Sequence, residues 1–252
     1  MYLLLFSYFV VGITIGSFLN VCIYRLPIGM SVVSPPSRCG SCGHRLGGLD
    51  MIPVLSYFLL GGKCRYCHTH YSMRYALVEL LTGLLFALAG KYFLPGIPLI
   101  LIFILICCLI VITFIDFDHQ IILNRFVALV FVTGLLFTHF YTHNWLYALY
   151  GMLFSGGLMG AIYFLSRGGM GAGDVKLSFA LGIWAAIPGS MVVLLLAFVM
   201  GGLVGVVLLA TKLKTRKDPI PFGPYLCIAM YINLLYGPYL VYYYWRFFAS
   251  LK

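Results

Sequence analysis

The sequence predicts an all-α polytopic membrane protein with about eight transmembrane helices and a small cytoplasmic zinc-knuckle loop domain. Apolar residues make up 63% of the chain and charged residues only 9%. The apolar residues gather in long runs, and the basic residues fall in alternate connections. Soluble domains carry roughly 25% charged residues, because water has to solvate their surface. A chain with so few charges is suited to lipid, which solvates an apolar outer face.

Eight apolar runs approach the length that a helix needs to cross about 30 Å of hydrocarbon. The first has no basic residue before it and no small-residue cleavage site, so we interpret it as a retained span rather than a signal peptide. The predicted spans are 2–24, 75–94, 97–115, 126–142, 145–166, 176–187, 190–211 and 222–245. They divide the chain into a first transmembrane helix at 1–24, a zinc-binding loop domain at 25–74 and a transmembrane catalytic core at 75–252.

Lysine and arginine are distributed unequally between the connections. If the N-terminus lies outside, only Lys91, Arg246 and Lys252 are outside, and the other thirteen of the sixteen basic residues are inside. Basic connections are retained in the cytoplasm, so both termini are predicted outside and the 25–74 loop inside. The net charge of +10 then reflects topology rather than nucleic-acid binding, and the Lys212–Lys217 run is expected to lie on anionic lipid headgroups.

The one hydrophilic stretch carries Cys39-x-x-Cys42 and, after a gap of twenty-one residues, Cys64-x-x-Cys67. A two-residue gap lets both thiolates of a turn reach one tetrahedral ion at about 2.3 Å, and two such pairs are typical of a four-thiolate zinc site. We predict a structural Zn²⁺, because four thiolates leave no open position for water. Two disulfides are the alternative, which a reducing cytoplasm disfavours. Three loop histidines are further candidate ligands, although such residues are more often solvated: His44, His68 and His70.

Only six residues are acidic, so each can be considered separately. Asp50 and Asp218 are expected to face water. Asp116 and Asp118 close the third span and Asp174 opens the sixth, which places all three at the predicted cytoplasmic face. Two carboxyls a few ångströms apart share a proton, and the ionised member can activate water while the protonated one polarises a carbonyl. Helix-end aspartates solvated at the interface are the structural alternative, which spacing alone leaves open.

Glu79 lies in the first turns of the second span, where an ionisable group usually faces a cavity or a partner. A salt bridge with Arg74 or Arg25 and a functional role are both open. Gly171 and Gly173 precede the aspartate of the sixth span and remove side chains where a peptide would approach.

Together these residues resemble the type IV prepilin peptidases, membrane aspartic proteases with a Gly-x-Gly-Asp signature. A lone Gly-x-Gly-Asp would be weak evidence, whereas six ordered segments along nearly the whole chain are highly specific. The segments are GSFLNVCIYRLP at 16–27, the paired Cys-x-x-Cys loop, RYALVELLTG at 74–83, FIDFD at 114–118, GAGDVK at 171–176 and IPFGP at 220–224.

The resemblance implies a catalytic pair at Asp116 and Asp174, with Asp118 as the competing candidate for the first position. The first aspartate of the family is usually followed, after a short gap, by Leu-Pro or Ile-Pro, but here that region reads Ile-Leu-Asn at 122–124. Because the proline is missing, the match to the family does not decide whether Asp116 or Asp118 takes the first catalytic position. Four further residues are candidate supporting residues: Glu79, Gly171, Gly173 and Lys176.

The resemblance also implies a substrate and a compartment. The expected reaction removes a short basic leader, after a glycine, from type IV prepilins or the pseudopilins of type II secretion, on the cytoplasmic side of a bacterial inner membrane. Many bacterial members with such a zinc loop also methylate the new N-terminus with S-adenosylmethionine, so this second activity is implied as well. Precursors and membrane lipid are the expected partners, and nucleic acid is not.

Two other functions compete with the peptidase. One is a transporter or ion pathway whose membrane carboxylates bind cations or relay protons. Aspartates at the ends of spans, and the absence of a clear internal repeat, argue against it. The other is an inactive assembly protein that docks through its zinc loop, against which the retained Gly-x-Gly-Asp aspartate argues.

Overall fold

The computed structural model describes residues 1–166, 169–215 and 218–250, without the side chains of 244, 245 and 247–250. Four basic residues that enter the predicted topology lie outside the described residues: Arg167, Arg216, Lys217 and Lys252. Every regular element of the described part is a helix, and its only β-structure is two isolated bridges in the 26–73 loop. The predicted all-α fold is therefore confirmed.

Seven of the described helices are long and apolar enough to cross a membrane. In chain order the helices are α1 (Tyr2–Arg25), η1 (Gly48–Met51), α2 (Leu55–Leu59), α3 (Arg74–Tyr92), α4 (Ile97–His119), α5 (Asn124–Phe137), η2 (Thr138–Thr142), α6 (Trp145–Leu165), α7 (Ala172–Ala210) and α8 (Gly223–Ser250). They form two compact units, 1–111 and 112–252. Compactness does not test the division into a first helix, a zinc-binding loop and a catalytic core, which stays a prediction.

Large apolar side chains lie exposed along the outer faces of these helices, as at Leu84 in α3 and Leu203 in α7. A soluble protein rarely exposes extended apolar surface, whereas lipid solvates such a surface well. The exposed apolar faces are therefore those expected of a multi-pass membrane protein.

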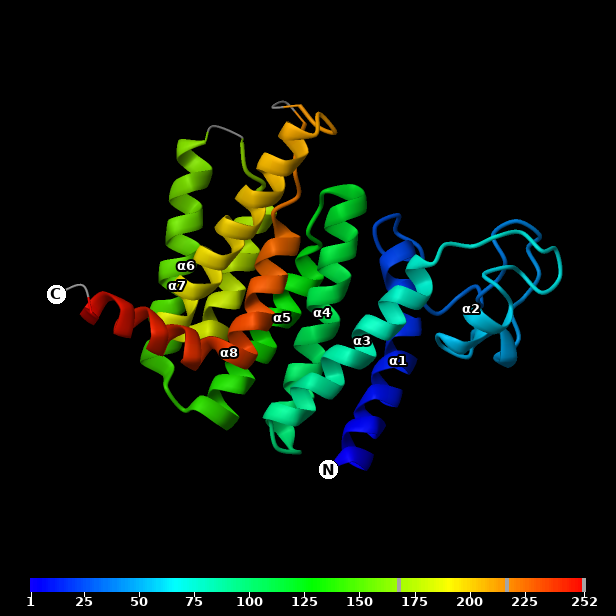
Figure 1. Cartoon of the computed structure of the whole chain (residues 1–252), viewed down its shortest axis with the longest axis horizontal. Coiled ribbons are helices and arrows are strands. Elements are labelled where there is room, and N and C mark those ends of the chain that lie inside the picture. Colours follow the sequence, from blue (N-terminus) through cyan, green and yellow to red (C-terminus); the bar gives the residue numbers. More distant parts are fainter. Residues whose placement is uncertain (167–168, 216–217, 251–252) are drawn as a thin grey trace. The chain divides into compact units, whose positions relative to one another are not determined.

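In the first unit, α1 and α3 run antiparallel with their backbones almost in contact (Figure 1). A Cβ added at Gly12 would lie 2.7 Å from the Cα of Gly83, and one added at Gly16 would lie 2.7 Å from the Cα of Glu79. Small residues permit such a close approach between membrane helices. The loop at 26–73 connects the adjacent ends of this tight pair.

In the second unit, α7 consists of two antiparallel arms. The backbone leaves the helical conformation at Ala186, with φ 49°, and at Ile187. The Ser190 hydroxyl donates to the carbonyl of Ala186 at 2.7 Å and to that of Gly182 at 3.4 Å. Residues eight apart in a continuous helix would be separated by about 12 Å along its axis, so the chain turns back here.

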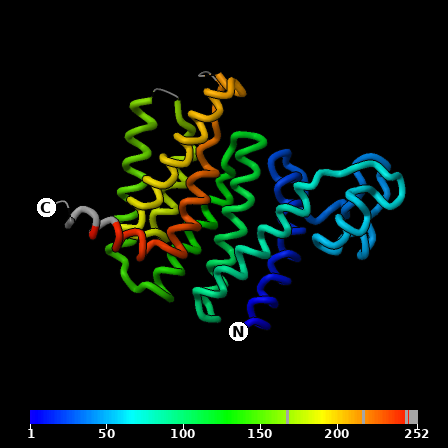
Figure 2. The backbone as a smooth tube through the Cα atoms, in the orientation of Figure 1, coloured from blue at the N-terminus to red at the C-terminus, as the bar shows by residue number. Residues whose placement is uncertain are grey.

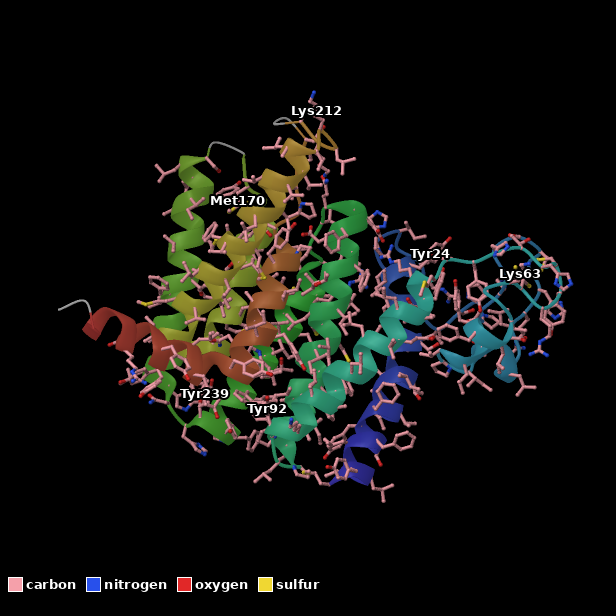
Figure 3. All side chains as sticks on the ribbon, in the orientation of Figure 1. Tyr24, Lys63, Tyr92, Met170, Lys212 and Tyr239 are labelled. Carbon is pink, nitrogen blue, oxygen red and sulfur yellow. The ribbon has the colours of Figure 1, made fainter. Side chains whose placement is uncertain are left out.

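The turn returns α7 to the end of the unit from which it started. Met170, just before α7, and Lys212, just after it, lie at the same end of the second unit, and Tyr239 of α8 lies at the other (Figure 3). The path can be followed along the backbone in Figure 2. The two predicted spans 176–187 and 190–211 correspond to the two arms of this one helix.

The first arm of α7 is clamped by its neighbours α5 and α6. The Ser155 hydroxyl of α6 donates to the carbonyl of Ser178 at 2.8 Å. The Trp184 indole donates to the carbonyl of Val130 in α5, also at 2.8 Å. A Cβ added at Gly182 would lie 2.5 Å from a backbone oxygen of α6. These contacts hold the arm, and with it the residues at its start, in one position.

Candidate functional site

The two Cys-x-x-Cys turns of the loop fold alike. In the first, Cys39 N–H donates to the carbonyl of His44 at 2.9 Å, and Gly43 N–H donates to that of Cys39 at 3.0 Å. In the second, Cys64 N–H and His68 N–H make the corresponding bonds at 2.9 and 3.0 Å. Gly43 and His68 occupy the same place, with φ of 70° and 57°, a left-handed conformation that glycine favours.

These turns bring the four predicted zinc ligands together. The sulfur atoms of Cys39, Cys42, Cys64 and Cys67 all lie within 4.8 Å of one another, and the Cys39 and Cys67 sulfurs are 3.7 Å apart. A tetrahedron with metal–sulfur bonds of about 2.3 Å has edges of about 3.8 Å. The cluster therefore has nearly the dimensions of the sulfur shell around one zinc ion. Hydrogen bonding with Thr69 lowers the pKa of Cys67 to about 6, which favours the thiolate, the form that binds a metal.

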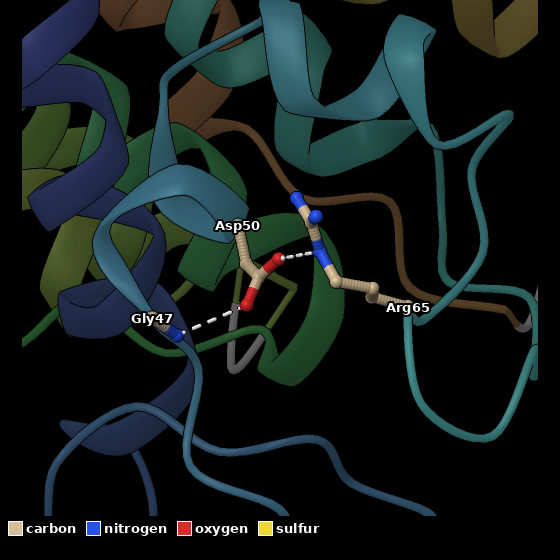
Figure 4. A network of polar contacts seen from close by, with 3 residues as sticks. All are labelled: Gly47, Asp50 and Arg65. Atoms are coloured by element: carbon tan, nitrogen blue, oxygen red, sulfur yellow. Dashed lines mark hydrogen bonds and ion pairs between the residues drawn. The ribbon is translucent and has the colours of Figure 1, made fainter.

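An ion pair stiffens the loop between the two turns (Figure 4). Asp50 Oδ1 lies 2.6 Å from Arg65 Nε, and its Oδ2 accepts the N–H of Gly47 at 3.0 Å. Hydrogen bonds from Gly47 N–H and then from Arg65 lower the pKa of Asp50. Its side chain is only 6% exposed, so the expectation that Asp50 faces water is wrong. The pair ties the segment around η1 to the second cysteine turn.

Glu79 joins α3 to the same loop. Its carboxylate is buried, accepts the N–H of Val54 at 2.7 Å and accepts a hydrogen bond from the Ser17 hydroxyl of α1. Val54 has φ 64°, which is disfavoured for a β-branched residue, so this bond holds the loop in a strained conformation. Arg25 donates to the carbonyl of Ser31 at 3.0 Å. Glu79 thus lies in the first unit as a docking point for the loop.

The aspartates at the end of α4 have different surroundings. Asp116 is buried, 5% exposed, and its Oδ2 accepts the N–H of Gly223 at 3.1 Å. Asp118 is exposed. The residues between α4 and α5 contact the chain before α8, where Gln120 donates to the carbonyl of Pro219 at 3.3 Å.

Asp174 lies in the first turn of α7, after the N-cap residue Gly171. It is 9% exposed, and its Oδ1 atom is buried with no hydrogen-bond partner among the described residues. Lys176 is exposed and donates to the Asn124 side chain at 3.2 Å. That asparagine stands where the resemblance leads one to expect proline, and its side chain makes a hydrogen bond between α5 and α7 that proline could not make.

Asp116 and Asp174 lie close enough for the charge of Asp116 to act on the Asp174 carboxyl. The side chain of Ile122 bridges the two helix starts beside them. A Cβ at Gly173 would lie 3.1 Å from Ile122 Cβ, and one at Gly223 would lie 3.2 Å from Ile122 Cδ1. Two carboxyls that feel each other's charge tend to hold one proton between them. Such a pair can supply both a base and an acid.

Sequence reasoning identified the segments that carry Gly223 and Ile122 but gave neither residue a role. Gly223 was visible only as part of IPFGP at 220–224, and Ile122 only as part of a region that lacks a proline. Both depend on contacts between residues about a hundred positions apart, for which a single sequence has no signal. The contact between Glu79 and Val54, 25 residues apart, has no signal in a single sequence either.

Two protein-family models match the chain. Residues 10–93 match the Bacterial Peptidase A24 N-terminal domain, and residues 103–206 match the Type IV leader peptidase family.

Relatives that bear the name prepilin leader peptidase/N-methyltransferase match most of the chain. That of Aeromonas salmonicida is 35% identical over 91% of this chain and 89% of its own. That of Pseudomonas aeruginosa is 34% identical over 90% and 88%, and that of Dichelobacter nodosus is 31% identical over 90% and 89%. No solved structure matches the chain. With both domains matched and similarity along nearly its whole length, this chain belongs to the type IV leader peptidase family.

Proposed function

We propose that this chain is a membrane aspartic endopeptidase that removes the short basic leader of type IV prepilins or type II secretion pseudopilins after a glycine. The observation that carries the proposal is a pair of buried carboxyls at one end of the second unit, Asp116 and Asp174, which lie close enough for their charges to interact. Family membership supports the same reaction, because relatives over most of the chain bear the name of a prepilin leader peptidase.

The reaction follows from the chemistry of a carboxyl pair that holds one proton. The ionised carboxylate takes a proton from water as the water attacks the scissile carbonyl, and the protonated carboxyl donates to the carbonyl oxygen. The proton gained by the base then goes to the leaving amine. A Cβ at Gly171 would lie 3.4 Å from Asp174 Oδ2, so the glycine leaves that carboxyl without a neighbouring side chain where an extended peptide backbone can approach it. Gly173 instead packs against Ile122.

The cytoplasm is the proposed side of cleavage. The distribution of lysine and arginine between the connections supports an orientation with the ends of α4 and α7 and the cysteine loop on that side, and with both termini outside. A prepilin is itself a membrane helix with a basic leader, so its apolar stem can enter lipid while the leader reaches the carboxyls at the rim. Membrane lipid is thus a partner of both enzyme and substrate.

The cysteine loop is proposed to hold a structural Zn²⁺ with Cys39, Cys42, Cys64 and Cys67. When bound, the ion crosslinks the two cysteine turns, because four thiolates complete its tetrahedral shell. The loop has little apolar core of its own, so this crosslink gives it a defined fold.

N-methylation of the new N-terminus with S-adenosylmethionine is proposed as a second activity. Its support is the name shared by the relatives, prepilin leader peptidase/N-methyltransferase. A transporter or ion pathway is not favoured, because the chain belongs to a peptidase family and its buried aspartates lie at helix ends rather than mid-membrane.

The test is cleavage of a purified prepilin by the protein in liposomes, with the products weighed by mass spectrometry. We expect Asp116→Asn and Asp174→Asn each to lower the cleavage rate by about 10²–10⁴-fold or more, because each removes a proton-transfer group. Asp118→Asn is the matched control two residues along α4 and should cleave at a rate near that of the unaltered protein.

Full activity in Asp116→Asn together with loss in Asp118→Asn would assign the first position to Asp118. Full activity in Asp174→Asn would exclude it from the reaction. A further mass gain of one methyl group, dependent on added S-adenosylmethionine, would establish the second activity.

A further inference from the structure

Gly223, the first residue of α8, presents its N–H to Asp116. The first N–H groups of a helix have no partner inside the helix and seek one outside it. Here the Gly223 N–H donates to Asp116 Oδ2 at 3.1 Å, in a bond buried from solvent. A backbone donor at the positive end of a helix stabilises a carboxylate and fixes its orientation.

The geometry leaves no room for a side chain at this position. A Cβ at Gly223 would lie 2.7 Å from Asp116 Oδ2 and 3.3 Å from Asp116 Cγ. Its φ lies outside the left-handed region, so the requirement for glycine is steric and not conformational. Any other residue would push the carboxylate out of its place.

A displaced carboxylate has little free space to move into, because its surroundings are packed. Asp116 is buried, and the Cβ of a residue at 223 would also lie 3.2 Å from Ile122 Cδ1. Ile122 in turn abuts the α7 start, where a Cβ at Gly173 would lie 3.1 Å from Ile122 Cβ. Ile122 therefore acts as a spacer between the helix that begins at Gly223 and the helix that carries Asp174.

We propose that Gly223 and Ile122 are positioning residues for the peptidase reaction: the Gly223 N–H holds the Asp116 carboxylate in place, and the Ile122 side chain sets the gap between the starts of α7 and α8. This inference rests on the proposed function. It assigns a role to a glycine that touches a reacting carboxyl through its backbone alone.

The first experiment measures kcat and KM for cleavage of a purified prepilin by Gly223→Ala in liposomes. We expect kcat to fall by about 10²-fold, because small misplacements of reacting groups have effects of that size, while KM stays near that of the unaltered protein. Gly157→Ala and Gly202→Ala are matched controls. A Cβ at either position meets no atom within 4 Å, so both should retain kcat.

The second experiment tests the spacer by rescue. Ile122→Val removes Cδ1, which gives the methyl group of Gly223→Ala a place to move away from Asp116. The double variant should therefore recover kcat by about 5-fold or more over Gly223→Ala, the sign of a coupled pair. Ile122→Val alone is measured to complete the cycle.

Two results would overturn the proposal: a kcat in Gly223→Ala within about twofold of the unaltered protein, or no recovery in the double variant. If Gly223→Ala does not accumulate in the membrane, Ile122→Ala carries the test, since it removes the spacer without adding a clash. A lowered kcat there supports the proposal, and an unchanged kcat overturns it.

Asp116→Asn in the same assay separates this inference from the proposed function. If Asp116→Asn retains full cleavage, the assignment of Asp116 itself fails. If Asp116→Asn is inactive and Gly223→Ala is fully active, only the positioning role fails.

Discussion

The cysteine loop of the first unit and the aspartate end of the second unit both bring reactive side chains together. They differ in whether an atom of the cluster is left without a bonding partner. The four cysteine sulfurs lie within 4.8 Å of one another, close to the spacing of a complete tetrahedral shell. The aspartate end instead has an unsatisfied hydrogen-bonding atom, because Asp174 Oδ1 is buried without a hydrogen-bond partner among the described residues.

This difference separates a site suited to structure from one suited to chemistry. A closed shell contributes folding energy and offers no position for a substrate. A buried polar atom without a partner costs free energy, and a native protein tolerates that cost mainly where a water or substrate completes the bond. The same contrast predicts that the two units respond to different perturbations.

The largest expected effect is loss of zinc from the double variant Cys42→Ser/Cys67→Ser. Apparent zinc binding energies in such sites are about 10–16 kcal/mol, so removal of two thiolates should reduce the zinc content from one ion per chain to none. The 26–73 loop should then be cut faster by a soluble protease, while the helical circular dichroism of the membrane core is kept.

Cys107→Ala, a change outside the loop, should retain zinc and is the control. Zinc content unchanged in the double variant would show that the cysteine cluster is not the metal site.

The converse perturbation is Gly182→Ala, which acts on the second unit alone. The added Cβ would lie 2.5 Å from the carbonyl oxygen of Gly151 and 2.7 Å from the Cα of Met152, where neither backbone can give way. Overpacking of this kind destabilises by about 1–3 kcal/mol, so the thermal midpoint in detergent should fall while the zinc content stays the same. Gly157→Ala, with open space at its Cβ, should leave the midpoint unchanged. Equal midpoints for the two variants would contradict the close α6–α7 contact.

A smaller effect is expected where the loop docks on the helices, at Glu79. Glu79→Leu removes the acceptor of the Val54 N–H, at a cost of about 1–3 kcal/mol for a buried donor left unpaired. The rate of protease cleavage in the 26–73 loop should rise accordingly, without loss of zinc. Glu79→Gln keeps an oxygen acceptor at the same place and should be cut at close to the original rate. If both variants are cut equally fast, the charge rather than the hydrogen bond docks the loop.

The sequence predicted most of the fold, because lipid imposes a strong pattern on it. Long apolar runs located the helices, and the two runs 176–187 and 190–211 anticipated that α7 has two arms. The Cys-x-x-Cys spacing predicted the cysteine cluster, since the geometry of a turn and of a tetrahedral ion are both local. These features depend on residues close together along the chain.

The contacts around the carboxyls could not be predicted, because they join distant segments. Asp116 meets Gly223, and Glu79 meets Val54, with no regular spacing between the partners. Asp116 and Asp118 look alike in sequence, and only packing separates the buried one from the exposed one. The choice of Asp116 rested on resemblance, and its burial now supports that choice.

The short first arm of α7 has a consequence for the lipid around it. The arm runs from Ala172 to Ala185, so its axis is only about 20 Å long, against about 30 Å of hydrocarbon in a typical bilayer. A helix shorter than the hydrocarbon layer brings the polar groups at its ends closer to the membrane midplane unless the bilayer thins around the protein. Asp174 stands in the first turn of this arm, so we expect bilayer thickness to affect how water reaches its carboxyl.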